Sequence, residues 1–323
     1  MITLEINDIL TIPSLLHKSS IIKIQIIDKL SYYTFKISIL NSSFYITKYD
    51  YYFLKISPIP SNNFNIYEKS KFLHKCFDIL EYKNYLLYIF EFMDTNLNDY
   101  YYKFIQKIHI SAKLYLLAEI TEGISKALHI LHKNNVIHNN VTAENILIKK
   151  KSNNLIKIAL NNNHIIFDNL IYSKHIFHKI PLQTILHLNN NKSNTETLLK
   201  TQNFDLYCLI FSISELITKD KYFTLENQDY IKNFIELLLT NSFIDIKKIN
   251  EMKLKIIKIF DDSYRKLKII CQTAISIIDS IKIKTKLLLK IKSLFTIIIE
   301  VMNPNIQKYP NSDYVIQKLK VDP

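Results

Sequence analysis

The spacing of apolar residues changes near residue 94, and this change constrains the fold more than any other feature. From about residue 21 to 93, β-branched and aromatic runs are broken by Asn, Ser and Asp, a pattern typical of short strands. The predicted strands are Ile22–Ile27, Thr34–Leu40, Tyr51–Ile56, Phe77–Leu80 and Tyr85–Phe92. One helix is predicted among them, at Ile66–His74, after a cluster of breaker residues at 58–63.

After residue 94 the apolar residues recur at helical spacing. Leu117, Ile120, Ile124 and Leu128 lie on one face of a predicted amphipathic helix, Ala112–Lys133. Further helices are predicted at 203–218, 228–240, 250–278 and 283–302. The sequence therefore predicts an α+β protein with an N-terminal extension at 1–20, a small β-rich lobe with one helix at 21–93, and a larger, mainly α-helical lobe at 94–323.

Glycine occurs once in the chain, as Gly123. Loops that wrap backbone around phosphate normally use several glycines, because glycine alone combines positive φ with close approach. A Walker-type P-loop, a GxGxxG fingerprint and a nucleophile elbow are therefore excluded.

The formal net charge is +13. Such a charge suits an acidic partner such as nucleic acid, a membrane surface or a phosphoprotein. Arginine, which provides most phosphate forks, occurs only as Arg265, so we expect a solvated lysine surface. A basic nucleic-acid-binding module remains an alternative.

The three cysteines, Cys76, Cys208 and Cys271, are far apart in the sequence. Their spacing predicts buried, reduced thiols rather than disulfides or a zinc site. The first residues lack the pattern of a signal peptide, and charged residues interrupt every apolar stretch before it could span a bilayer. We expect an intracellular protein, most simply cytoplasmic, without a membrane span.

The segment His138–Asn145 contains the most informative motif. His138, Asn140 and Asn145 have the spacing of HRDxxxxN, and Ile146 and Leu147 complete an ENIL ending. This segment resembles the catalytic loop of eukaryotic protein kinases. In that family the Asp of the motif accepts the proton of the substrate hydroxyl, and the Asn binds magnesium.

Other segments resemble kinase motifs in the same order. Glu91 and Met93 follow Phe90 as the hinge residues follow the gatekeeper, and Asp205 matches the helix F aspartate that holds the catalytic-loop backbone. Met302-Asn303-Pro304 and Tyr309-Pro310 resemble the terminal segments of the family. The resemblance spans about residues 21 to 320 and implies a bilobal protein-kinase-like fold, in which His138 and Asp205 are structural residues.

The resemblance implies the positions that would bind a nucleotide. Lys55 matches the strand lysine that contacts the phosphates, and Glu68 is the nearest acid for pairing with it. Glu91, Met93 and Asn145 are the remaining candidates. Tyrosines at 32 and 33 replace the glycines of the phosphate-covering loop.

The charged positions of the family are lost at several points. Asn140 replaces the catalytic Asp, and Leu160 falls where the DFG aspartate holds magnesium. Asp168 could replace that aspartate only after a large shift in register, so no metal ligand is assigned. The two partners of the family's APE–Arg ion pair correspond to Leu182 and Tyr309, both uncharged.

We therefore interpret the chain as a catalytically inactive pseudokinase that acts as a scaffold or allosteric regulator through protein–protein interaction. ATP would bind, if at all, without magnesium. The alternatives are a divergent, active Ser/Thr kinase and the nucleic-acid module. The loop at 137–141 is similar to that of the N-terminal-kinase-like pseudokinases, which are trafficking proteins. A helical insert at about 219–290 is either extra packing or a docking element for an unknown partner protein.

Overall fold

The structure is a computed structural model that describes residues 4–15, 21–31, 34–41, 51–57, 70–151, 155–161, 180–187, 202–218, 222–240, 246–282, 285–306 and 309–320. The chain divides into two compact units. The first comprises Met1–Thr95 with Leu147–Leu170, and the second comprises Asn96–Ile146 with Ile171–Pro323.

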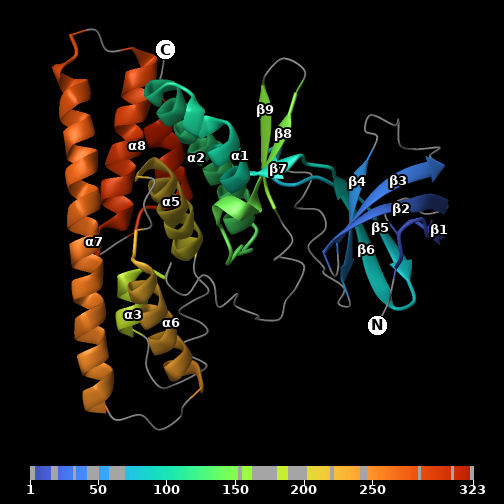
Figure 1. The fold of residues 1–323 in the computed structure, drawn as a ribbon, viewed down its shortest axis with the longest axis horizontal. Coiled ribbons are helices and arrows are strands. Elements are labelled where there is room, and N and C mark those ends of the chain that lie inside the picture. Colours follow the sequence, from blue (N-terminus) through green and yellow to red (C-terminus); the bar gives the residue numbers. More distant parts are fainter. Residues whose placement is uncertain are drawn as a thin grey trace. The chain divides into compact units, whose positions relative to one another are not determined.

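Six antiparallel strands form the main sheet of the first unit, in the order β1-β2-β3-β4-β6-β5 (Figure 1). They are β1 (Ile9–Pro13), β2 (Ile21–Ser31), β3 (Thr34–Asn41), β4 (Tyr52–Ser57), β5 (Cys76–Tyr82) and β6 (Tyr85–Glu91). The five strands predicted from the sequence are confirmed as β2 to β6. They form because β-branched and aromatic side chains fit a pleated, half-buried surface.

Strand β1 was not predicted. It pairs with β2, and the two residues that follow it pair with β5, the last strand in the order. Ser14 forms an antiparallel bridge with Leu80, and the Leu15 N–H donates to the Ile79 carbonyl at 2.8 Å. The Ser14 hydroxyl also donates to the buried Asp78 carboxylate at 2.8 Å. The first and last strands are thus joined at one end, and the boundaries proposed at residues 20 and 93 stay predictions.

Side chains alternate between the two faces of each strand. On β4, Tyr52, Leu54 and Ile56 belong to one core cluster, together with the inward residues of β1, β2 and β3. Phe53 packs against a second cluster formed by Cys76, Ile79, Tyr88 and Phe90. Lys55, two residues beyond Phe53, lies on this second face.

A smaller sheet, in the order β7-β8-β9, contains β7 (Thr95–Asn96), β8 (Ile146–Lys150) and β9 (Ile156–Leu160). Leu160 at the end of β9 also forms a parallel bridge with Leu73. The helix predicted at Ile66–His74 is therefore wrong over residues 70–74, which form a turn followed by this bridge. Backbone hydrogen bonds to Leu160 hold residues 72 and 74 in place of helical ones; residues 66–69 lie outside the described part.

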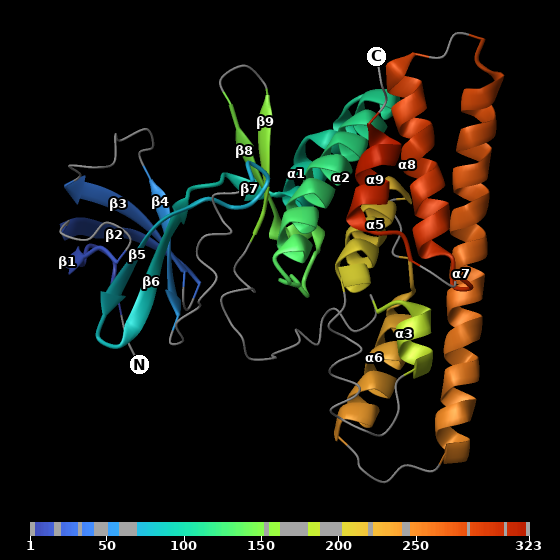
Figure 2. The same cartoon turned by 180° about the vertical axis from the view of Figure 1, so that it is seen from behind.

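The second unit is mainly helical (Figure 2). Its helices are α1 (Leu97–Lys103), α2 (Ile110–Lys133), α3 (Leu182–His187), α5 (Gln202–Thr218), α6 (Leu225–Thr240), α7 (Ile246–Ser280), α8 (Lys286–Met302) and α9 (Ser312–Leu319), with 3-10 turns η2 (Ile105–Lys107) and η3 (Ala143–Asn145). The helices predicted after residue 94 are confirmed within a few residues. Helix α2 packs against α5, α8 and α9, and α7 packs against α8. Gly123 lies buried inside α2.

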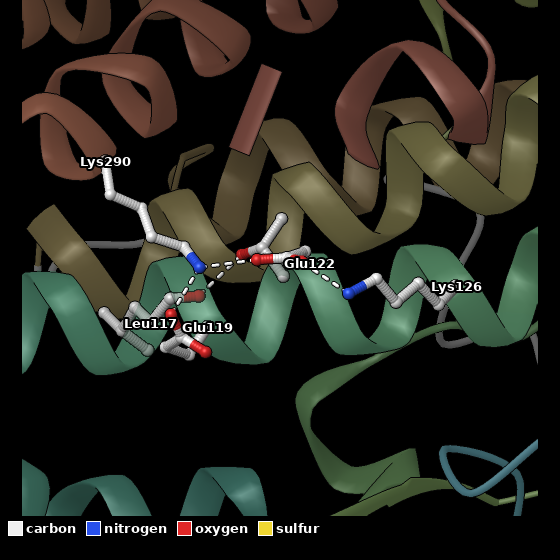
Figure 3. A network of polar contacts seen from close by, with 6 residues as sticks. Leu117, Glu119, Glu122, Lys126 and Lys290 are labelled. Atoms are coloured by element: carbon white, nitrogen blue, oxygen red, sulfur yellow. Dashed lines mark hydrogen bonds and ion pairs between the residues drawn. The ribbon is translucent and has the colours of Figure 1, made fainter. Parts of the chain in front are cut away.

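A partly buried ionic network links α8 to α2 (Figure 3). The Lys290 ammonium forms ion pairs with Glu119 and Glu122, and Glu122 pairs in turn with Lys126 one helical turn later. Charged residues are rarely buried unless they are paired, so this network fixes how the two helices face each other.

The α+β class predicted from the sequence is confirmed, with a β-rich N-terminal sheet and a mainly helical C-terminal region. Within the described residues, every helix is too short or too polar to cross a membrane.

Candidate functional site

The loop at 138–145 lies in the second unit, and helix α5 holds its backbone. Asp205, in the first turn of α5, is fully buried. Its carboxylate accepts hydrogen bonds from the backbone N–H groups of His138 and Asn139, both at 2.7 Å. The resemblance implies this contact. Hydrogen bonds to a carboxylate are stronger than neutral ones, so a single buried group fixes the start of the loop.

His132 adds a third hydrogen bond to the same carboxylate. Its Nε2 lies 3.0 Å from an Asp205 oxygen, and both side chains are buried. Because a carboxylate oxygen accepts, Nε2 is the donor. Helix α2 thereby contacts the loop anchor through its last turn.

His138 is buried and acts within the loop itself. Its Nδ1 accepts from the Asn140 N–H at 3.3 Å, so in the neutral ring the proton is on Nε2. Between these residues Asn139 has φ of 61°, a left-handed conformation that Asn adopts more readily than most residues. This arrangement gives His138 a structural place in the loop.

Asn145, in η3, closes the loop. Its amide nitrogen donates to the Asn140 carbonyl at 2.9 Å and lies 3.5 Å from the Thr142 hydroxyl. The structure therefore brings Asn140 and Asn145 together. A side-chain amide at Asn140 can donate or accept hydrogen bonds but has no basic site at neutral pH.

Lys55 lies in the first unit, on the face of the sheet that carries Tyr88 and Phe90. It is paired in register with Thr34 on β3 and Tyr88 on β6, and it is only 8% exposed. Burial lowers the pKa of Lys55 from 10.5 to about 7, because the ammonium form loses its hydration.

Glu91 ends β6, and its carboxylate is buried. It pairs with Lys149 at 3.4 Å and, more closely, with Lys157, which come from β8 and β9. Burial alone would raise the pKa of Glu91, but the hydrogen bond and charge of Lys157, with the charge of Lys149, hold it below its ordinary value. The Glu91 side chain is thus part of an ion-pair cluster, and Met93, two residues on, is buried.

His74 contacts the same residue through the backbone. Its Nε2 donates to the Glu91 carbonyl at 2.7 Å, and its ring stacks on Phe90 with centroids 4.9 Å apart. Burial lowers the pKa of His74 to about 4, so the ring is neutral at physiological pH.

Leu160 occupies the position of the metal-binding aspartate implied by the resemblance. Its side chain is fully buried. Its N–H donates to the Phe72 carbonyl at 2.7 Å, and its carbonyl accepts from the His74 N–H at 2.9 Å. Backbone bonds on both sides fix this residue in β9, and an alkyl side chain offers no oxygen to a hard cation.

Several predicted positions lie outside the described residues. These are Glu68, Asp168 and the tyrosines at 32 and 33. Over the residues whose positions are given, no group of three His, Cys, Asp or Glu side chains gathers as a potential metal site.

Leu182 and Tyr309, the positions of the family's APE–Arg ion pair, both lie in packed surroundings. Leu182 begins α3 and is buried. The Tyr309 ring packs edge-on against Tyr207 of α5, with centroids 6.1 Å apart. Burial raises the pKa of Tyr309, as expected for a phenol in apolar surroundings.

Sequence reasoning missed His132, His74 and the lysine pair around Glu91 as partners of the candidate residues. Each contact joins residues that are far apart in the sequence, such as Lys157 and Glu91, 66 positions away. The sequence around Lys149 and Lys157 does not reveal which carboxylate they meet.

The comparison with family models gives a match within the kinase-like part of the chain. A model described as protein tyrosine and serine/threonine kinase matches residues 66–162. The matched residues are thus similar to the protein kinase superfamily. The match includes Glu91, the loop His138–Asn145 and Leu160, and the bilobal kinase fold agrees with the β-rich sheet and helical region. No curated protein matches the chain.

Proposed function

We propose that this kinase-like protein does not carry out magnesium-dependent phosphoryl transfer and acts instead through binding to other proteins. Leu160 carries the proposal. Kinase catalysis depends on positioning and on electrostatic stabilisation by metal ions held by an aspartate at this place. A buried leucine whose backbone is bonded on both sides cannot be replaced there by a neighbouring side chain without breaking strand β9.

Asn140 supports the same proposal. The loop is well formed, because Asp205 and Asn145 hold its backbone. It therefore presents an amide where an active kinase presents a carboxylate. Positioned acid–base groups contribute about 10²–10⁴-fold in rate, and an amide does not supply that contribution.

The partial charge of Lys55 also supports the proposal that the protein does not transfer phosphate. A lysine whose pKa is about 7 is protonated only about half of the time at neutral pH. In this state of the protein Lys55 therefore carries its positive charge only part of the time, so it attracts a phosphate less than a fully charged lysine does. Nucleotide binding, where it occurs, is then expected without magnesium.

The proposed place of action is inside the cell. All three cysteines are free and buried, as expected for a protein in a reducing compartment. The likeness of the loop to the N-terminal-kinase-like pseudokinases stays a hypothesis, and the partner is addressed below only by its chemistry.

A thermal-shift series with ATP, with and without magnesium, tests the proposal together with transfer of γ-phosphate to a generic protein substrate. We expect no magnesium-dependent rise in melting temperature and no transfer above background. The result that overturns the proposal is transfer that the variant Asn145→Ala loses and the control Asn233→Ala, at an exposed position on α6, retains.

The divergent active kinase is the second candidate, and the ordered loop favours it. Asn145 is held against the Asn140 carbonyl, in a geometry that could present its amide oxygen to a cation. The same assay decides between the two candidates. A nucleic-acid module would instead bind RNA with steeply salt-dependent affinity, measurable by fluorescence anisotropy.

A further inference from the structure

Helix α7 has one face packed on the protein and one long face turned to solvent. It contains 35 residues and is therefore about 52 Å long. Its buried residues recur at helical spacing: Ile249, Ile256, Phe260, Leu267, Cys271 and Ile278. Helix α7 contacts α8, α3 and α6 (Figures 1 and 2).

The two ends of the outward face differ in character. Between Leu267 and Ile278 the exposed residues are three isoleucines and three uncharged polar residues. Ile269 is 63% exposed, Ile270 46% and Ile277 59%, and Ile281 continues the row just past the helix. Apolar side chains grouped in this way on a surface mark an interaction site more often than isolated ones do.

Positive charge gathers on the other part of the same face. The exposed cations there are Lys247, Lys248, Lys255, Lys258, Arg265 and Lys266, against the exposed acids Glu251 and Asp262. Leu254 is the one large apolar residue exposed among them in this described stretch. The face is thus basic from residue 247 to 266. From 269 to 281 it carries four exposed isoleucines among uncharged polar residues, with Asp279 as its one exposed charge up to Ile281.

We propose that this face of α7 docks an acidic amphipathic helix of a partner protein. The partner's carboxylates would lie along the basic part, and its apolar residues would cover the isoleucines. Long-range attraction between the charges would align the partner, while burial of the isoleucines would slow its dissociation. The proposal names the chemistry of the partner for the binding role proposed above, and it rests on that role.

The basic residues and the isoleucines lie on separate parts of this face. This separation favours binding of a partner helix over binding of a bilayer surface or of a second copy of the chain. A bilayer surface would take up apolar residues along the whole helix, but the basic part offers it only Leu254. A second copy of this chain, related by a two-fold axis, would set the basic part against itself or against the isoleucines. Neither arrangement neutralises the six cations.

The test uses the full chain and a synthetic helical peptide whose first half is rich in Glu and whose second half carries a Leu stripe. Its control is a peptide of the same composition in scrambled order. Binding is measured by fluorescence anisotropy at several salt concentrations. We expect the segregated peptide to bind at least about tenfold more tightly than the scrambled one, with affinity that falls as salt rises.

Two paired variants locate the binding. Ile270→Ser with Ile277→Ser should weaken binding about tenfold, since truncating central apolar anchors has effects of this size. Lys258→Glu with Lys266→Glu should weaken it by a similar factor and remove most of the salt dependence. The matched controls are Leu225→Ser on α6, 65% exposed, and Lys133→Glu at the exposed end of α2. Circular dichroism checks that each variant folds.

Equal binding of the two peptides, or binding that the isoleucine pair leaves unchanged, would overturn the proposal. A dimer in sedimentation that the isoleucine pair dissociates would assign the face to a second copy. Binding to vesicles containing phosphatidylserine, lost in the same variants, would assign it to a membrane. Phosphate transfer by the chain would overturn the proposed function alone and leave the peptide result standing.

Discussion

Replacing Lys290 with methionine tests how much the partly buried ionic network contributes to the helical unit. Lys290 projects from α8 toward α2, and its side chain is 7% exposed (Figure 3). Burial alone would lower the pKa of Lys290, but the hydrogen bonds and charges of Glu119 and Glu122 outweigh it and raise that pKa. The protonated lysine is therefore held by its partners, and Lys290→Met removes the charge while keeping most of the stem.

The expected loss in the free energy of unfolding depends on how Glu119 and Glu122 are stabilised once Lys290 is gone. Without Lys290, Glu122 keeps Lys126 as its ion-pair partner among the described residues, and that side chain is 41% exposed. Glu119 can return to water because it is 44% exposed. Breaking a fully buried ion pair costs about 3–5 kcal/mol. We expect about 2–4 kcal/mol here, because one of the two carboxylates regains its hydration. Adding Glu122→Gln should restore about half of the loss, since the unpaired charge is then absent.

The free energy of unfolding is measured by urea titration, followed by circular dichroism of the helical signal. The matched control is Lys292→Met, also on α8, whose partner Asp279 is 40% exposed and whose own side chain is 35% exposed. We expect this control to lose less than about 1 kcal/mol. Equal losses for the two lysine variants, or additive losses in the double variant, would refute the assignment of the network to the core.

Three further predictions concern the two units separately. Lys55 is protonated in the unfolded chain up to its ordinary pKa of 10.5 but loses the proton above about 7 when folded. The free energy of unfolding should therefore rise with pH above 7, and Lys55→Met should flatten this rise and stabilise the protein by about 2–4 kcal/mol at pH 6, measured by urea titration. Asp205→Ala leaves two buried donors and one part-buried donor without their acceptor and should cost about 3–5 kcal/mol. The exposed control Asp262→Ala should cost about 0.5 kcal/mol, and similar losses for the two variants would contradict the anchoring role. Ser14→Ala should cost about 1–3 kcal/mol and speed hydrogen exchange at the Leu15 amide; unchanged exchange there would count against the joined strands.

The elements that follow a local pattern were predictable from the sequence. Strands β2 to β6 and the long helices come from periods of two and 3.6 residues, which burial on one face imposes. The turn joining β5 to β6 carries no glycine. Lys83 and Asn84 adopt φ of 50° and 63° there, which the flanking strands enforce.

The elements that depend on distant partners were not predictable. Residues 70–74 favoured a helix locally, but their backbone groups bond to Leu160, on a strand that follows almost ninety residues later. Strand β1 is short and ends in proline, so its own sequence gives a weak signal.

The contacts of the candidate site also fall into those that were predictable from the sequence and those that were not. The resemblance in motif order implied the contact between Asp205 and the loop, because the motif specifies both partners. It did not imply His132 on Asp205 or His74 on the Glu91 carbonyl. Those contacts arise only when the fold brings separate segments together. The position of Leu131-His132, six residues before His138, resembles the end of helix E in the family but does not name Asp205 as the partner of His132.

The return of the chain from β1 to β5 affects how the first unit can be made on the ribosome. Ser14 emerges early, but its partner Asp78 follows 64 residues later. The edge of β1 that pairs with β5 therefore stays unpaired while β2, β3 and β4 are synthesised. Pairing over such a sequence separation is slow relative to hairpin formation. During synthesis this unpaired edge is accessible to neighbouring chains. Pairing of β1 with β5 is therefore the step at which folding competes with misassembly.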